Sequence, residues 1–279
     1  MKKTQLIFLS ILTIFLFNFT KEIIVKNDLD KMNLKGKVKS IKEVSYKALV
    51  KSEKIVKGKK ERFQSYDEMD KLFMFNEQGN EIERKEFYSE GSLNERYTKL
   101  YNKEGNLLET VVYNADGSFF YRATYIYDEN NRCIECKGAE SKWIYKYNEL
   151  GNLIEEYKYY ILGDEMENKK TYEYDKNNNK ISESSYSEDS LDYKWTYKYD
   201  ENKKLIEFNE GTDGVFNYKW IYKYDKKGNL IEEDKYSFGL LQTKSIYKYD
   251  FDKRGNWIKR IRFIGKLPKY ILEREIIYF

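Results

Sequence analysis

The sequence predicts an all-β fold in which tandem antiparallel β-hairpin repeats form one long, curled meander sheet or a solenoid-like spiral. Three observations predict it: aromatic and polar residues alternate, Asp-x-x-Gly turns recur, and the combined motif returns about every 25 residues. The chain has 28 tyrosines but one proline in 279 residues. Tyrosine rings and the stems of charged side chains must therefore supply much of the apolar surface.

The first twenty residues differ from the rest. Lys2 and Lys3 precede an apolar run from Leu6 to Phe19, which has the length of a signal peptide and is short for a bilayer span. The sequence around Phe17 to Thr20 offers no Ala-x-Ala cleavage site. We therefore interpret residues 1–20 as a signal peptide or an N-terminal anchor, and expect a periplasmic, cell-surface or secreted protein.

The remaining chain divides into three parts. Residues 21–69 are expected to form N-terminal capping strands, with a strand at 36–46 and a lysine-rich loop or hairpin at 47–60. Residues 70–265 hold the repeats. Residues 266–279 are expected to form a C-terminal capping strand.

The clearest repeat runs from Trp220 to Glu233 and reads Trp-Ile-Tyr-Lys-Tyr-Asp-Lys-Lys-Gly-Asn-Leu-Ile-Glu-Glu. Its first half alternates with period two, so the aromatic side chains share one strand face. The Asp and Gly then form a tight turn. Counting across the turn brings Tyr224 opposite Leu230 and leaves Ile231 on the other face. Eight such turns begin at residues 76, 102, 128, 148, 175, 200, 225 and 252.

A second turn closes each repeat, with candidates at 89–92, 114–117, 211–214 and 237–239. Eight repeats then give about sixteen strands, more than an open sheet usually holds without curling or splitting. We therefore expect a spiral, a partial barrel or an elongated solenoid in which each repeat contacts its neighbours.

The repeated Tyr-x-Tyr-Asp-x-x-Gly-Asn-x-Ile resembles the YD repeat of the RHS (rearrangement hotspot) family of exported bacterial proteins, over roughly residues 70–265. The resemblance implies β-hairpins wound into a sheet or shell, exposure outside the cytoplasm, and carbohydrate or surface binding or the enclosure of a payload. The chain ends at Phe279, shortly after the last repeat. We therefore expect a small member of this family without a toxin domain.

The residue types point away from catalysis. There is no histidine, the commonest general base and metal ligand. Cys133 and Cys136 fall in a predicted strand, where residues three apart point to opposite faces, so we expect neither a disulfide nor a metal site. Neighbouring carboxylates such as Glu155 and Glu156 also face opposite ways. No cofactor is predicted, and the interleaved 51 basic and 47 acidic residues disfavour nucleic acid as a partner.

An aromatic stripe is the best candidate binding site. Its members hold equivalent repeat positions, either as strand core or as an open ladder of rings: Trp143, Tyr145, Trp195, Tyr197, Trp220 and Tyr222. The favoured hypothesis is a non-catalytic extracytoplasmic scaffold that binds a polysaccharide or an envelope surface partner. The alternatives are a structural or assembly protein that pairs through sheet edges, and a glycosidase using carboxylates from different repeats. Membrane contact is expected only through the N-terminal segment, and the oligomeric state is left open.

Overall fold

The computed structural model describes residues 27–60, 70–212 and 215–279. The signal or anchor segment predicted at 1–20 lies outside these residues. One short helix precedes the strands, and the elements are α1(Asp28–Lys31), β1(Val38–Lys51), β2(Lys54–Lys57), β3(Asp70–Phe75), β4(Glu81–Phe87), β5(Leu93–Tyr101), β6(Leu107–Asn114), β7(Phe119–Tyr127), β8(Cys133–Lys137), β9(Ser141–Tyr147), β10(Leu153–Tyr160), β11(Met166–Tyr174), β12(Lys180–Ser187), β13(Ser190–Tyr199), β14(Leu205–Thr212), β15(Val215–Tyr224), β16(Leu230–Ser237), β17(Leu240–Phe251), β18(Trp257–Ile264) and β19(Leu267–Tyr278).

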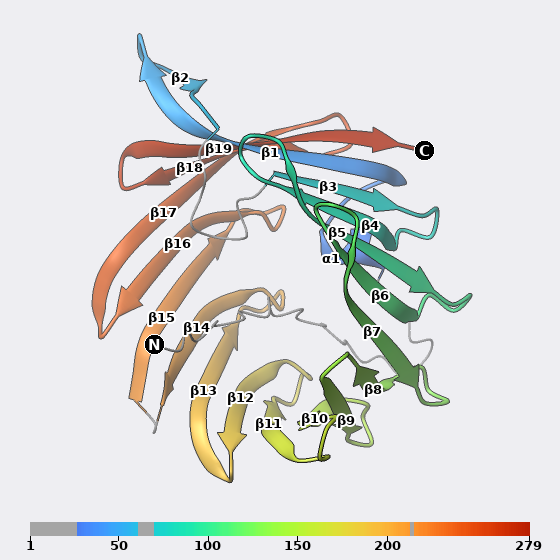
Figure 1. Cartoon of the computed structure of the whole chain (residues 1–279). Coiled ribbons are helices and arrows are strands. Elements are labelled where there is room, and N and C mark those ends of the chain that lie inside the picture. Colours follow the sequence, from blue (N-terminus) through green and yellow to red (C-terminus); the bar gives the residue numbers. More distant parts are fainter. Residues whose placement is uncertain (1–26, 61–69, 213–214) are drawn as a thin grey trace, which may run out of the picture.

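The sheet closes on itself. From β3 to β19, each strand pairs antiparallel with the next one in the chain, and β1 pairs with both β19 and β3. The result is a closed antiparallel barrel of 18 strands (Figure 1). The expectation of an open, curled meander sheet or spiral is therefore wrong. Ile41 of β1 lies opposite Ile276 on one side and Phe73 on the other, so one strand covers both edges that an open meander would expose.

The lysine-rich region predicted at 47–60 is a hairpin. The second half of β1 leaves the barrel wall and pairs with β2, with Leu49 opposite Val56. This β1–β2 hairpin projects from the barrel next to β19 (Figure 1).

The Asp-x-x-Gly turns form as predicted, and each is followed by a bulge. In the clearest repeat the Asp225 carboxylate accepts hydrogen bonds from the Lys227 and Asn229 backbone amides at 2.9 Å, and Gly228 takes φ +84°, which glycine adopts readily. Tyr224 lies opposite Leu230, which confirms the predicted pairing, and Lys223 then lies opposite Glu232. Ile231 is therefore an extra residue in the returning strand.

This bulge changes which residues share a face. In β8, Cys133 lies opposite Tyr127 and Cys136 opposite Tyr125. Tyr125 and Tyr127 are two residues apart on one strand and point the same way. The prediction that the two cysteines point to opposite faces is therefore wrong, because the bulge at the start of β8 adds one residue to the count.

The N-terminal segment shows which face is the inside. Helix α1 lies within the ring of strands (Figure 1). It packs at the closure between β1 and β3, where the apolar core gathers as Leu29, Leu34, Val38, Ile41, Phe73 and Phe75. Phe75 occupies the position directly before a turn, as Tyr224 does in its own repeat. The aromatic face of the repeats is therefore the inner wall of the barrel.

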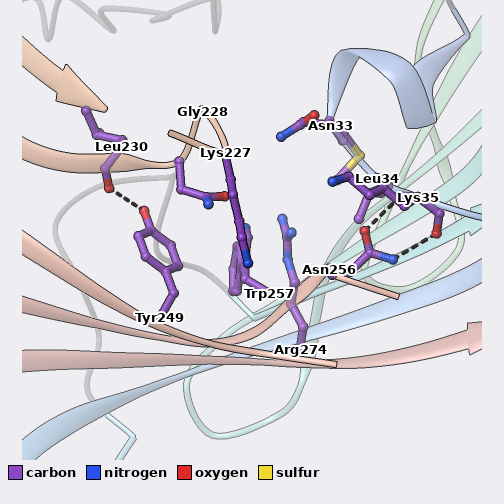
Figure 2. A pocket seen from close by; sticks show the side chains of 13 residues that line it. Asn33, Leu34, Lys35, Lys227, Gly228, Leu230, Tyr249, Asn256, Trp257 and Arg274 are labelled. Atoms are coloured by element: carbon purple, nitrogen blue, oxygen red, sulfur yellow. Dashed lines mark hydrogen bonds between the residues drawn. The ribbon is translucent and has the colours of Figure 1, made fainter. Parts of the chain in front are cut away.

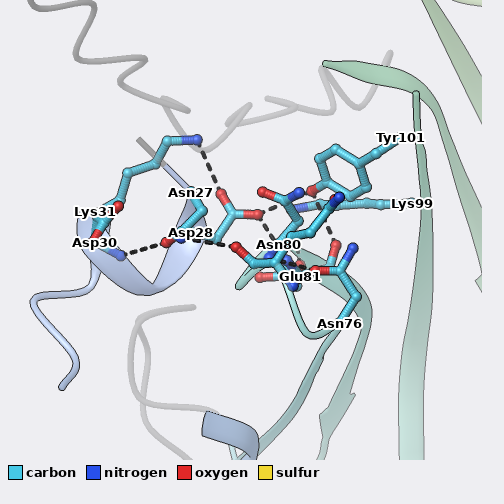
Figure 3. Close-up of polar contacts among 10 residues, drawn as sticks. Asn27, Asp28, Asp30, Lys31, Asn76, Asn80, Glu81, Lys99 and Tyr101 are labelled. Atoms are coloured by element: carbon cyan, nitrogen blue, oxygen red, sulfur yellow. Dashed lines mark hydrogen bonds and ion pairs between the residues drawn. The ribbon is translucent and has the colours of Figure 1, made fainter. Parts of the chain in front are cut away.

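The same segment fastens the closure at both ends. The Asp28 carboxylate accepts hydrogen bonds from the Glu81 amide at 2.8 Å and the Tyr101 hydroxyl at 3.0 Å (Figure 3). At its other end, the Lys35 backbone bonds to the Asn256 side chain through both its N–H and its C=O, each at 2.8 Å. The segment thus joins the first hairpin of the barrel to the last Asp-x-x-Gly turn.

Candidate binding site on the inner wall

The predicted aromatic stripe lies on the inner wall. Its residues come from β9, β13 and β15, and each is partly buried. Three of them lie directly opposite a glutamate of the neighbouring returning strand: Tyr145 opposite Glu156, Trp195 opposite Glu183, and Tyr222 opposite Glu233. Directly opposite residues of antiparallel strands share a face and are close enough to interact. The inner wall therefore places aromatic rings next to glutamate carboxylates.

Two aromatic columns run along β13 and β15. Phe208 of β14 joins them, with its ring centroid 5.4 Å from Tyr197 and 5.0 Å from Trp220. Toward the end of the barrel away from the Asp-x-x-Gly turns, Tyr193 stacks on Trp195 and Tyr218 contacts Trp220, at 5.8 and 6.1 Å.

These two end rings are the most accessible in the columns. Tyr193 is 48% exposed and Tyr218 44% exposed, whereas the stripe residues deeper along each strand are partly buried. Along each column, the exposure of the rings therefore decreases from the tip end toward the Asp-x-x-Gly turns.

Charged groups border the columns. The Glu183 carboxylate accepts contacts from Lys170 at 3.1 Å, Lys180 at 2.7 Å and the Tyr197 hydroxyl at 3.2 Å. The next inner carboxylate, that of Glu156, accepts a hydrogen bond from the Tyr172 hydroxyl at 3.1 Å. Acceptors and donors therefore alternate along the wall beside the rings.

The two carboxylates differ in acidity. Burial raises the pKa of Glu156, and the opposing influence of Lys170 does not cancel it. Burial acts on Glu183 in the same sense, but Lys180 and Lys170 outweigh it and lower the pKa of Glu183. Two inner carboxylates of equivalent repeat position are thus held in different environments.

The structure does not bring all six stripe residues together. Trp143 on β9 lies opposite Lys158 and Cys136, and the Lys158 ammonium lies 5.7 Å from its ring centroid. Tyr145 belongs to the same strand. These two residues form a separate group beside the cluster that contains Trp195, Tyr197 and Trp220, with Tyr222 further along β15.

The sequence analysis did not predict Phe208, Glu156 and Glu183 as members of this wall; Lys170 was also missed, although it alternates with Tyr172 and Tyr174 on β11. The position that Phe208 and the two glutamates occupy holds a different residue type in other repeats, such as Cys136, so no motif marks it. The signal that could have found them is the bulge, which brings the fourth residue of each returning strand onto the aromatic face.

The outer wall is charged. Glu155 contacts Lys146 at 3.3 Å and Lys169 at 3.0 Å, and these ion pairs span neighbouring strands. Hydrogen bonds from Lys169 and Tyr157 lower the pKa of Glu155 to about 2. Glu207 makes the same double contact with Lys198 and Lys219, at 2.8 and 3.0 Å. As predicted, adjacent carboxylates such as Glu155 and Glu156 lie on opposite faces.

The inner cysteines are held as thiols of low reactivity. Both are free, and Cys136 is buried. Burial raises the pKa of Cys133 to about 11 and that of Cys136 to about 12, and the thiolate is the reactive form. Within the described parts of the chain, no group of three or more Cys, Asp or Glu side chains is placed to hold a metal ion.

A pocket lies between the N-terminal segment, the β15–β16 turn and β17–β19. Leu34, Tyr249, Trp257 and Arg274 are among the residues that line it (Figure 2). The Arg274 guanidinium lies 3.4 Å from the Trp257 ring centroid and is paired with Glu43 at 2.7 Å. Its charge is already satisfied within the protein, so the columns on β13 and β15 are the better binding site.

Comparison with known proteins assigns no family. No family model and no curated protein matches the chain. A solved Tc holotoxin pore of Photorhabdus luminescens is similar at 14% identity and a TM-score of 0.38 over 78% of this chain, which spans 13% of the toxin chain. A porin-like protein from Bacteroides uniformis is similar at 9% identity and a TM-score of 0.43, over 86% of this chain and 96% of that one. Both likenesses are too low to bear on function.

In residues 27–60, 70–212 and 215–279, no helix is long and apolar enough to cross a membrane.

Proposed function

We propose that the chain is a non-catalytic extracytoplasmic scaffold that binds a polysaccharide along the aromatic columns of β13 and β15. The observation that carries this proposal is the pair of columns, open at one end and bordered by Glu183 and Lys170. Flat rings give large contact area to sugar faces at low entropic cost. Carboxylates and ammonium groups supply the acceptors and donors that sugar hydroxyls need.

The spacing of the columns supports an extended ligand. Strands β13 and β15 are separated by β14 alone, which places them about 9.5 Å apart. One oligosaccharide can contact rings on both.

Binding to an array of bacterial and host glycans tests the proposal. Trp195→Ala and Trp220→Ala should each weaken binding about tenfold or more, the loss expected for a central aromatic anchor. Tyr157→Ala is the matched control, because Tyr157 lies on the outer wall beside Glu155. Near-ultraviolet circular dichroism checks that the variants stay folded. If the wild-type protein binds no glycan, or if the control loses binding equally, the proposal fails and a structural role is favoured.

A glycosidase is the second candidate, favoured by one observation. Glu156 and Glu183 share the inner wall and their pKa values shift in opposite directions, as an acid and a base or nucleophile require. The two lysines on Glu183 favour the binding role instead. Release of reducing ends from a bound glycan, abolished in both Glu156→Gln and Glu183→Gln, would establish the enzyme; binding without product would exclude it for that glycan.

A further inference from the structure

The end of the barrel away from the Asp-x-x-Gly turns exposes large apolar side chains. At the β16–β17 tip, Phe238 is 71% exposed and Leu240 is 68% exposed. Leu241 of the same tip is also exposed, and the flanking tips add Val215, Phe216 and Leu267. The barrel wall does not bury these groups, and clustered exposed apolar side chains usually mark an interaction surface.

The tips are joined to one another. The Phe238 amide donates a hydrogen bond to the Asn217 carbonyl of β15 at 2.7 Å, and the ring centroids of Phe238 and Tyr218 lie 6.3 Å apart. The Gly265 amide bonds in the same way to the Lys244 carbonyl of β17 at 3.0 Å. These contacts hold the β16–β17 tip against β15 and the β18–β19 tip against β17, so neighbouring tips lie side by side.

The β1–β2 hairpin extends this surface and adds positive charge. Lys47 of β1 lies opposite Tyr270 of β19, so the hairpin begins beside the β18–β19 tip. In Figure 1 the hairpin projects toward the top left, and the β18–β19 and β16–β17 tips project to the left below it. Leu49 and Val50 are exposed on it. Exposed lysines accompany them on the hairpin and the neighbouring tip: Lys51, Lys54, Lys266 and Lys269.

Other tips at this end of the barrel are acidic. Asp116, Asp164, Glu188 and Asp189 lie at or beside the tips between β6 and β13. Exposed apolar residues on those tips lie beside carboxylates: Phe119 and Phe120 share a tip with Asp116, and Leu162 shares one with Asp164. The sector made of Leu49–Lys54, Val215–Phe216, Phe238–Leu241 and Lys266–Lys269 instead combines apolar side chains with four exposed lysines, Lys51, Lys54, Lys266 and Lys269, and one exposed carboxylate, Glu53. We name this sector the apolar–basic tip surface.

We propose that the apolar–basic tip surface docks on an anionic phospholipid membrane. Aromatic and aliphatic side chains on separate protruding tips can enter the boundary between headgroups and acyl chains, and the lysines beside them contact anionic headgroups. The charge complementarity favours an anionic bilayer over a neutral one. A bilayer also accommodates separate protruding tips, whereas a protein partner would need a closely matched shape. This proposal is independent of glycan binding on the inner wall, and it adds a second membrane contact to the one expected through the N-terminal segment.

Sedimentation of the full chain with vesicles tests the proposal. The vesicles contain phosphatidylcholine alone or a mixture with phosphatidylglycerol. A Phe238→Ser, Leu240→Ser double variant should bind the mixed vesicles about tenfold or more weakly than the wild type, since it removes two inserted apolar groups. A Lys51→Gln, Lys54→Gln, Lys266→Gln variant should lose most of the preference for the mixed vesicles.

Leu162→Ser is the matched control. Leu162 is 92% exposed but lies on an acidic tip beside Asp164, so its substitution should leave vesicle binding unchanged. The apolar segment at residues 6–19 is the same in every variant, so differences between variants report on the tips. Equal binding of the wild type and the double variant would overturn the proposal. It would also be overturned if the double substitution abolished self-association of the protein without changing vesicle binding, because a second copy would then be the partner.

Discussion

The two ends of the barrel differ: the turn end is held together by hydrogen bonds, and the tip end exposes apolar side chains. At the turn end, the Asp-x-x-Gly-Asn motifs satisfy their own backbone groups, and the N-terminal segment crosses from the Asn80 turn to the Asn256 turn. At the tip end, the connections leave Phe238 and Leu240 in solvent. The contrast indicates that the N-terminal segment fastens the barrel at the turn end, while the tip end leaves large apolar side chains uncovered.

Tyrosine hydroxyls reinforce the turn end. In most repeats the hydroxyl of an inner tyrosine near the turn donates a hydrogen bond to a carbonyl at the start of the preceding hairpin's returning strand. The pairs are Tyr101 to Glu81, Tyr127 to Leu107, Tyr147 to Cys133, Tyr174 to Leu153, Tyr224 to Leu205 and Tyr249 to Leu230, at 2.7 to 3.0 Å. Each bond ties one hairpin to the one before it, which gives the high tyrosine content a structural reason.

The largest effect is expected where the closure is fastened. Asn256 is 2% exposed and bonds to both backbone groups of Lys35 and to the Tyr278 hydroxyl. Asn256→Ala leaves the Lys35 N–H and C=O without these partners and should lower the free energy of unfolding by about 3 kcal/mol. Urea denaturation followed by circular dichroism measures it.

Asn229 provides the control for this substitution. It holds the equivalent position one repeat earlier, but its side-chain amide bonds to Asp225 of its own turn at 2.9 Å. Asn229→Ala should cost about 1 kcal/mol. Equal losses in the two variants would mean that the N-terminal segment does not fasten the closure.

An intermediate effect is expected for a single hydroxyl. Tyr224→Phe removes the bond to the Leu205 carbonyl, which is 2.9 Å long, and should destabilise the barrel by about 1 kcal/mol. Tyr193→Phe at the tip end keeps the stacked ring and alters a side chain that is about half exposed, so it should cost less than about 0.5 kcal/mol. Thermal unfolding of both variants compares them. A larger loss for Tyr193→Phe would reverse the contrast between the two ends.

Much of the turn end could be predicted from the sequence, because its order is local. Period-two alternation and Asp-x-x-Gly place strands, turns and the Tyr224–Leu230 pair without knowledge of distant residues. Closure could not be predicted in this way. Closure depends on β1 pairing with both β19 and β3. Neither β1 nor β19 carries a repeat motif that would identify its partner strand in the sequence.

The candidate site was predictable only in part, for a related reason. Alternation placed the stripe tryptophans on one face, but counting residues ignores the bulge after each turn. The bulge moved Cys136 onto the aromatic face and did the same for Glu156, Glu183 and Phe208. Whether those rings are covered depends on how far the sheet curls, which is a property of all the strands together.

The smallest expected effect is a pH dependence of stability that arises from carboxylates at the turn end. Burial would raise the pKa of Asp225 and Asp252, but hydrogen bonds lower both below the ordinary aspartate value. Asp225 accepts these bonds from the side chain and the backbone amide of Asn229. Asp252 accepts them from the Tyr278 hydroxyl and the Asn256 backbone amide. A carboxyl whose pKa is lower in the folded state stabilises the protein above its unfolded pKa. That contribution is lost as the pH falls through the folded value.

Asparagine substitutions test this dependence with a reciprocal control. Asn76, Asn102 and Asn148 already begin equivalent turns, and each accepts the corresponding backbone amide bond, so asparagine fits the position. The double variant Asp225→Asn, Asp252→Asn should melt a few degrees below the wild type at pH 7, in line with a loss of about 1 kcal/mol. The difference should shrink as the pH falls below the ordinary aspartate value. Asn148→Asp should do the reverse and gain acid sensitivity. A difference that stays constant with pH in both variants would show that the turn carboxylates act only as hydrogen-bond acceptors that asparagine replaces imperfectly, and that their charge does not stabilise the turn end.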